Sequence, residues 1–330
     1  MSHFIDLLNV RKLPGRQTVP TANVILPSRC VVGIDADQLR RAPDLMSINA
    51  VKNWLPHCFQ MDDLDLVTLA ARLADQAGAE ILAIRARGYT VSEKLDRSPV
   101  TDADLISQRT ILNGLRTRTP DIPAIAEEST TNRAEPIPSV FWLVDPLDGT
   151  REFAANLDEF VVNIGLVRDH EVVLGAVAAP ARHEVFTGVV GRGAWKRTGG
   201  TDMPIQVRDV PREGPIALVS RHDANDQRLP SMLARYEVAE TVRMGSGLKF
   251  CRIAEGKADL YVRPGRTMEW DTAAPHAILQ AAGGTVLTTE GKQLVYGKPN
   301  WENPSFVCAG AQSGRSRDQD RDPALAGDRE

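Results

Sequence analysis

The sequence has few cysteines and no long apolar run. Its four cysteines, Cys30, Cys58, Cys251 and Cys308, are too far apart in the sequence for a zinc knuckle or a redox pair. No stretch approaches the ~18 apolar residues that a membrane-spanning helix needs. The N-terminus has no apolar signal core before its charges and prolines begin. These absences favour a reduced, cytoplasmic setting without a membrane span.

An excess of one charge and phosphate-binding glycine loops are also missing. The net charge of −4 comes from acids and bases mixed along the chain, without the basic stripe that is typical of nucleic-acid binders. The stretch GSGLKF (245–250) lacks the third glycine of a dinucleotide fingerprint. Gly291-Lys292 lacks the earlier glycine of a Walker loop. We therefore expect no nucleic-acid polymer as a partner.

The composition that remains is ordinary for a globular protein, and 330 residues are enough for two joined domains. Residues 1–60 are broken by prolines and lack sustained periodicity, which predicts a loosely ordered extension; a small regulatory segment is the alternative. Residues 61–212 are predicted to form an α+β domain, and residues 213–311 a smaller α/β domain. The polar tail, 312–330, is predicted to be disordered.

Apolar periodicity places the main elements. It predicts a long amphipathic helix from about Met61 to Gly88 and a second helix from Asp102. Apolar runs separated by polar turns predict an antiparallel sheet with helices on one face, from strands near 140–145, 160–167, 172–180 and 184–190. The C-terminal part alternates predicted strands at 216–220, 238–243 and 258–262 with helices near 229–235, 246–256 and 273–284.

Two carboxylates follow the first buried strand closely. Asp145 and Asp148 flank Pro146-Leu147, and Gly149-Thr150 then begin a candidate helix whose free N–H groups would face an anion. Carboxylates held this close are costly unless a positive charge compensates them, and Mg²⁺ prefers oxygen ligands. The alternative is a capped turn, with Asp148 as N-cap and Asp145 bonded to backbone amides.

Further acidic groups stand after a short apolar stretch and at a predicted helix start. Glu127-Glu128 follow 122–125, and Asp271 follows Trp270. Taken alone, the glutamates are typical of a solvated loop and Asp271 of an N-cap.

Together, these segments resemble the signature of the inositol monophosphatase-like family of metal-dependent phosphatases. The sequence between about 61 and 311 carries the acidic pair, DPLDGT (145–150) and WDTAA (270–274) in the family's order. Within that family, further stretches look like the CysQ-type 3'(2'),5'-bisphosphate nucleotidase branch: SPVTDAD (98–104), DGTREF (148–153), GSGLKFC (245–251) and AEGKADLY (254–261).

The resemblance implies a layered αβαβα sandwich and a site with two or three Mg²⁺ ions. One ion would be held by Glu127, Asp145 and the carbonyl of Leu147, and a second by Asp145, Asp148 and Asp271. A third, weaker ion would use Glu127 and waters. Asp104 and Thr150 would orient the attacking water.

The residues implied to contact substrate come from the same motifs and from GSGLKFC: Leu147, Asp148, Gly149, Thr150, Ser246, Gly247, Lys249 and Asp271. For Lys249 an exposed helix lysine is the alternative. His222, which follows Ser220-Arg221, is a further candidate for approach to substrate, and His276 is expected to pack in a helix or lie at the surface. The chain departs from the branch at Pro264 and Arg266, which affects expectations about substrate preference more than about activity.

The expected activity is hydrolysis of the 3'-phosphate of adenosine 3',5'-bisphosphate to AMP, with 3'-phosphoadenylyl sulfate as a second substrate, a role in sulfate assimilation, and inhibition by Li⁺. One alternative is an inositol monophosphatase or a broad phosphomonoesterase, since the carboxylates would be the same. An inactive Mg²⁺ or nucleotide sensor is an alternative of another class. The sequence leaves the oligomeric state open.

Overall fold

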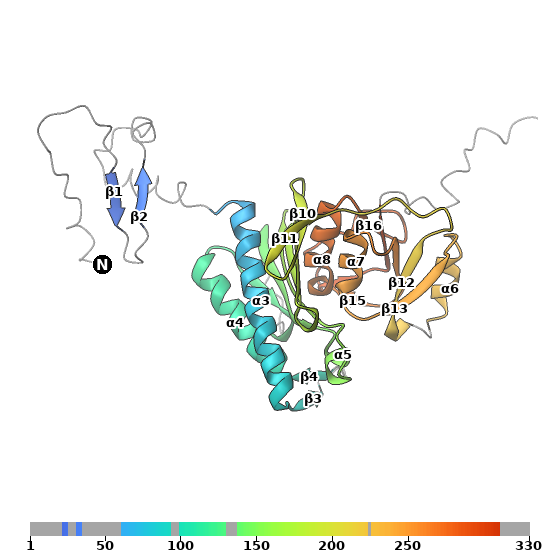
Figure 1. The fold of residues 1–330 in the computed structure, drawn as a ribbon, viewed down its shortest axis with the longest axis horizontal. Coiled ribbons are helices and arrows are strands. Elements are labelled where there is room, and N and C mark those ends of the chain that lie inside the picture. The colour runs from blue at the N-terminus through green and yellow to red at the C-terminus, as the bar shows by residue number, and fades with distance from the viewer. Residues whose placement is uncertain are drawn as a thin grey trace, which may run out of the picture. The chain divides into compact units, whose positions relative to one another are not determined.

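The computed structural model describes residues 22–25, 31–34, 61–93, 99–129, 137–223 and 226–310 (Figure 1). Contacts divide the chain into two units, 1–60 and 61–330. In the first unit, β1 (Ala22–Ile25) and β2 (Val31–Ile34) form an antiparallel pair. Apart from these two strands, the predicted N-terminal extension lies outside the described residues, and so does the predicted tail.

The second unit begins with two packed helices. Helix α3 (Asp63–Arg87) starts at Asp62, whose carboxylate accepts the backbone N–H of Asp65 at 2.8 Å, and buries a stripe of leucine, alanine and isoleucine. After the β3 (Val91–Glu93) and β4 (Pro99–Thr101) pair comes α4 (Asp102–Arg118). The helices touch closely at Gly114, where a Cβ would lie 2.3 Å from a Leu73 methyl group.

A seven-stranded sheet packs against these helices in the order β11-β10-β9-β8-β7-β6-β5. Its strands are β5 (Ala124–Ala126), β6 (Val140–Asp148), β7 (Val161–Arg168), β8 (Glu171–Ala179), β9 (Glu184–Val189), β10 (Gly193–Thr198) and β11 (Thr201–Ile205). Strands β5 and β6 are parallel, and every other pairing in this sheet is antiparallel. Short helical turns connect them: η1 (Glu127–Ser129), α5 (Thr150–Ala154) and η2 (Pro180–Arg182).

Helices cover both faces of this sheet, so the prediction of helices on one face was wrong. The central strands are apolar on both sides, and α8 (Glu269–Ala281) packs on the face opposite α3. Glycines make this contact possible: a Cβ at Gly175 would lie 2.2 Å from the Ala274 carbonyl oxygen, and one at Gly188 would lie 2.6 Å from Ile278 Cα. The helix begins four residues earlier than predicted, which places Asp271 in its first turn.

A five-stranded sheet in the order β13-β12-β14-β18-β16 completes the unit. Its strands are β12 (Ile216–Ser220), β13 (Glu240–Met244), β14 (Leu260–Arg263), β16 (Thr285–Thr288) and β18 (Phe306–Ala309). The remaining elements are η3 (Arg221–Asp223), α6 (Arg228–Leu233), α7 (Leu248–Ala254), and the pair β15 (Thr267–Met268) and β17 (Glu302–Asn303).

The layers therefore run α3/α4, first sheet, α7/α8, second sheet, α6, as Figure 1 shows. This confirms the predicted αβαβα sandwich. The predicted domain boundary near 212 falls between β11 and β12, which belong to different sheets, and it stays a prediction. No helix in the described part of the chain is both long and apolar enough to cross a membrane.

Candidate active site

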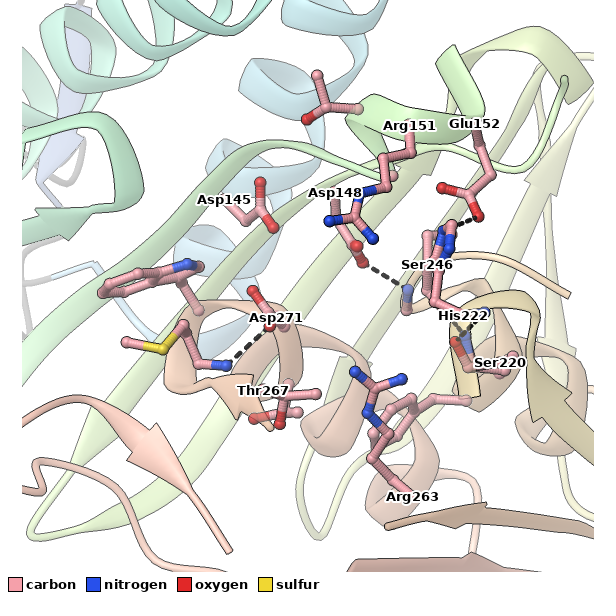
Figure 2. Close-up of a pocket in the computed structure, with 18 of the residues that line it drawn as sticks. Asp145, Asp148, Arg151, Glu152, Ser220, His222, Ser246, Arg263, Thr267 and Asp271 are labelled. Atoms are coloured by element: carbon pink, nitrogen blue, oxygen red, sulfur yellow. Dashed lines mark hydrogen bonds and ion pairs between the residues drawn. The ribbon is translucent and has the colours of Figure 1, made fainter. Parts of the chain in front are cut away.

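A pocket of about 590 Å³ lies where the two sheets and the middle helices meet. Its walls come from β6, α5, α7, α8 and the end of β14, which are distant in sequence. Figure 2 shows Asp145, Asp148 and Asp271 facing one another in it, with Arg263 on a second wall. All predicted metal and substrate residues line this pocket: Glu127, Asp145, Leu147, Asp148, Gly149, Thr150, Ser246, Gly247, Lys249 and Asp271.

A bulge at the end of β6 produces the spacing of the first two carboxylates. The register against β7 shifts between Asp145 and Asp148, so that Asp145 lies opposite Asn163 and Asp148 opposite Val161. Asp145 is 2% exposed and accepts the Leu147 N–H at 3.0 Å.

The capped-turn interpretation of Asp148 was wrong. Helix α5 has Gly149 as its N-cap, with a φ of 94° and no side-chain cap. Asp148 Oδ2 instead accepts the Gly247 N–H at 2.5 Å and the Asn163 amide at 3.2 Å. The Asp148 side chain is therefore oriented by two segments distant in sequence.

Parallel pairing brings Glu127 to the same edge of the sheet. Ala126, the last residue of β5, pairs with Val144, so the residues that follow both strands emerge together. Glu127 begins η1 there and lines the pocket. Its neighbour Glu128 donates its backbone N–H to Gln108 at 3.0 Å.

Asp104 reaches the pocket through Thr150. Asp104 is 1% exposed, and its Oδ2 accepts the backbone N–H and the hydroxyl of Thr101, both at 2.7 Å. Thr150 Oγ1 lies 3.1 Å from Asp104 Oδ1 and 3.1 Å from the Leu147 carbonyl oxygen. The hydroxyl can give its proton to either acceptor, and its lone pairs remain available to a water in the pocket.

Asp271 comes from the first turn of α8. It is not the N-cap: that position is Met268, whose backbone N–H donates to Asp271 Oδ2 at 2.8 Å. The carboxylate is thereby fixed at the positive end of the helix while it faces the two aspartates of β6.

Burial and mutual repulsion raise the pKa values of these aspartates. Burial raises the pKa of Asp145 well above its usual range, and Glu127, Asp148 and Asp271 raise it further. Burial likewise raises the pKa of Asp271. It raises the pKa of Asp148 to about 6, against the lowering effects of the Gly247 N–H and Lys249. A cation among these groups would relieve both costs.

The donor set fits a hard divalent cation. Carboxylate and carbonyl oxygens are the ligands that Mg²⁺ takes, and here they converge in a buried setting where like charges repel. Within the described residues, no three His, Cys, Asp or Glu side chains are already gathered into a finished metal cluster.

The GSGLKF segment forms the facing wall. Ser246 has a φ of 52°, uncommon for a residue other than glycine, and Gly247 gives its N–H to Asp148. Lys249 is 3% exposed, so the interpretation as an exposed helix lysine was wrong. Its Nζ donates to the Ser246 carbonyl oxygen at 2.6 Å and lies 4.8 Å from the centre of the Tyr261 ring.

The structure adds residues that sequence reasoning did not assign. Glu152, 3% exposed, lies with Oε1 3.0 Å from His222 Nε2, and both line the pocket (Figure 2). His276 is buried in α8, where it contacts Tyr296. Asn163 was missed as well, although it is a polar residue inside an apolar run, VVNIGLV, which is a usable signal.

Comparisons with known proteins show which proteins this chain is similar to. The sequence profile of the inositol monophosphatase family matches residues 63–318. A 3'(2'),5'-bisphosphate nucleotidase CysQ from Escherichia coli O157:H7 is 42% identical over 239 residues, which are 71% of this chain and 96% of that protein. The CysQ of Aggregatibacter actinomycetemcomitans is 34% identical over 71% of this chain and 89% of its own length.

Solved structures have the same fold. The crystal structure of CysQ from Bacteroides thetaiotaomicron matches with a TM-score of 0.66 and 34% identity, covering 74% of this chain and 97% of that one. An IMPase from Thermotoga maritima matches with a TM-score of 0.63 and 26% identity, covering 76% and 93% of the two chains.

Proposed function

This chain belongs to the inositol monophosphatase family and is a phosphatase, and we propose that it is a Mg²⁺-dependent 3'(2'),5'-bisphosphate nucleotidase. Its substrate would be adenosine 3',5'-bisphosphate, with 3'-phosphoadenylyl sulfate as a second substrate, and its products AMP and phosphate. One observation carries the proposal: a single pocket joins the four predicted metal-binding carboxylates to a wall with Lys249 and Arg263. The identity of 42% to a nucleotidase supports the substrate class.

The carboxylates divide into two sets of ligands. Glu127, Asp145 and the Leu147 carbonyl would hold one Mg²⁺, Asp145, Asp148 and Asp271 a second, and Glu127 would share a weaker third. Bound there, Mg²⁺ would neutralise phosphate oxygens and make water more acidic. Asp145 would stand in both sets, and Glu127 and Asp148 are the two groups that, after burial, most strongly raise its pKa.

The water that attacks phosphorus would be oriented by Thr150 and Asp104. When Thr150 donates to Asp104, at 3.1 Å, its oxygen can accept a hydrogen bond from that water. Water adds to phosphorus in line, the P–O ester bond on the far side breaks, and the 3'-hydroxyl leaves with a proton. Positioning and charge neutralisation supply most of the acceleration for this kind of transfer.

The basic wall would select the rest of the substrate. Lys249, Arg263 and Arg266 line the pocket with Tyr261 and Phe306. A charge-assisted contact to the second phosphate contributes ~1.5–3 kcal/mol, and the aromatic rings offer an apolar surface to the base.

The cellular role would be removal of a by-product of sulfate assimilation. Inhibition by Li⁺ stays a prediction.

A substrate panel tests the proposal. With Mg²⁺ present, we expect kcat/KM for adenosine 3',5'-bisphosphate to exceed that for inositol 1-phosphate at least roughly tenfold, a difference of about 1.4 kcal/mol. Arg266→Ala should narrow this ratio of kcat/KM values, because it removes a positive charge from the wall that would contact the second phosphate. The side chain is 63% exposed and pairs with Glu302, so its removal does not open the core. Equal efficiencies on both substrates would identify a broad phosphomonoesterase, and binding without turnover would identify a sensor.

A further inference from the structure

Asn163 is a polar residue in an apolar strand. Strand β7 reads VVNIGLVR, and only its last residue, Arg168, is exposed. The Asn163 side chain is completely buried. Burial of an amide is unfavourable unless its hydrogen bonds are replaced. This residue therefore calls for an explanation other than packing.

The NH2 group of the Asn163 amide donates a hydrogen bond to Asp148. Asn163 lies opposite Asp145 across the β6–β7 ladder, and its Nδ2 donates to Asp148 Oδ2 at 3.2 Å. The Gly247 N–H donates to the same oxygen. Two donors from different elements thus fix one oxygen of Asp148, which leaves the second oxygen to face a ligand in the pocket.

The carbonyl oxygen of the Asn163 amide has no hydrogen-bond partner in the described part of the chain. Asn163 Oδ1 is buried, and it makes no hydrogen bond among the described residues. A flipped amide would place this oxygen against Asp148 Oδ2 instead, and two acceptors would then repel each other, so Asp148 fixes the orientation. An apolar side chain of similar shape would avoid the unpaired acceptor. Asn163 is therefore a poor choice for stability and a good one for orienting Asp148.

We propose that Asn163 is a positioning residue for cation binding: its amide holds Asp148 Oδ2 so that Oδ1 is presented to a divalent ion in the pocket. The inference rests on the proposed Mg²⁺ site. It predicts that changes at position 163 alter ion affinity separately from stability. A residue that only packs in the core would change stability alone.

The test is a thermal-unfolding titration with Mg²⁺ on the full chain, which gives the metal-free melting temperature and the apparent affinity together. Asn163→Leu removes the donor and the unpaired acceptor while keeping the number and branching of the side-chain heavy atoms. We expect an unchanged or higher metal-free melting temperature and an apparent Kd for Mg²⁺ weakened about tenfold. Asn163→Ala should lower the melting temperature by leaving a cavity, yet weaken Mg²⁺ binding by a similar factor.

Ile164→Val is the matched control, because Ile164 is buried in the same strand and packs in the cluster on the opposite face. It should slightly lower the melting temperature and leave the affinity for Mg²⁺ unchanged. Wild-type affinity in both Asn163 variants would overturn the inference and leave the proposed function intact. A wild-type protein that does not respond to Mg²⁺ at all would overturn both.

Discussion

At the scale of single residues, burial and charge repulsion act together on Asp145. It is almost fully buried, and three neighbouring carboxylates oppose its charge. Burial of such a group destabilises the fold when no cation is bound, and under the proposed function the same group would be a ligand of both ions. The stability of the metal-free protein and the activity of the loaded enzyme should therefore respond in opposite directions when its charge is removed.

We predict that Asp145→Asn lowers kcat/KM by about 100-fold or more and raises the metal-free melting temperature. The amide has nearly the same shape but no charge to be repelled, and it is a poor replacement for a bridging ligand. Phosphate release and thermal melts measure the two effects. Asp102→Asn, on the exposed start of α4, is the control and should change neither. Near-normal turnover at low millimolar Mg²⁺ would show that Asp145 is assigned wrongly.

The sequence predicts some of these residues much better than others. Asp145, Asp148 and Asp271 can be found because each follows a strand or starts a helix in a recognisable motif. The burial of Lys249 cannot be found this way, since its contact with Tyr261 joins helix α7 to strand β14. Asn163 is visible as a polar interruption, but its role depends on a bulge in the neighbouring strand.

At the scale of elements, α8 joins the site to the rest of the fold. Its first residue, Glu269, is fully buried and accepts the backbone N–H groups of Gly297 at 2.6 Å and Lys298 at 2.8 Å. Periodicity alone predicted a start at 273, because the contacts that anchor the first turn come from a loop almost thirty residues later. Helix boundaries set by such tertiary contacts are not encoded locally.

Helix α8 also contains a buried titratable group, His276. Burial lowers its pKa to about 3, and it lies 2.9 Å from the Tyr296 hydroxyl. The folded protein therefore keeps this histidine neutral, whereas the unfolded chain takes up a proton near pH 6.5. The stabilising contribution is complete above pH 6.5 and is lost progressively as the pH falls from 6.5 toward 3.

We predict that His276→Gln makes the free energy of unfolding less dependent on pH below 6.5. This group can contribute up to ~1.4 kcal/mol per pH unit in that range. Urea unfolding of wild type and variant between pH 5 and pH 7.5 measures the difference. Parallel curves for His276→Gln and wild type would contradict a buried neutral histidine.

At the scale of the whole molecule, the middle layer decides where the site can form. Helices α7 and α8 pack between the two sheets, and the pocket opens where their first turns meet the end of β6. Residue patterns predicted the strands and helices, but not that β6 to β9 are covered on both faces. That arrangement came from the family resemblance, because a fully apolar strand indicates burial without naming its partners.

Contacts also divide the first sixty residues from the rest of the chain. Residues 61–330 form one compact unit, and α3 begins with its own cap at Asp62. The family profile starts at residue 63, and the matched region spans 96% of an Escherichia coli relative. An enzyme of this family is therefore accounted for without residues 1–58.

We predict that deletion of residues 1–58 shifts the melting temperature by less than about 2 °C and leaves kcat/KM within roughly twofold. Deletion of residues 1–66 is the matched control, because it also removes the Asp62 cap and the buried Leu66 from the first turn of α3. Loss of the cap costs about 1 kcal/mol and loss of a buried leucine ~2–5 kcal/mol, which together lower the melting temperature by roughly 6–20 °C for a domain of this size. Thermal melts and phosphate release on both truncated chains distinguish the outcomes. If the shorter deletion destabilises the protein as much as the longer one, residues 1–58 are a part of the folded enzyme and not an addition to it.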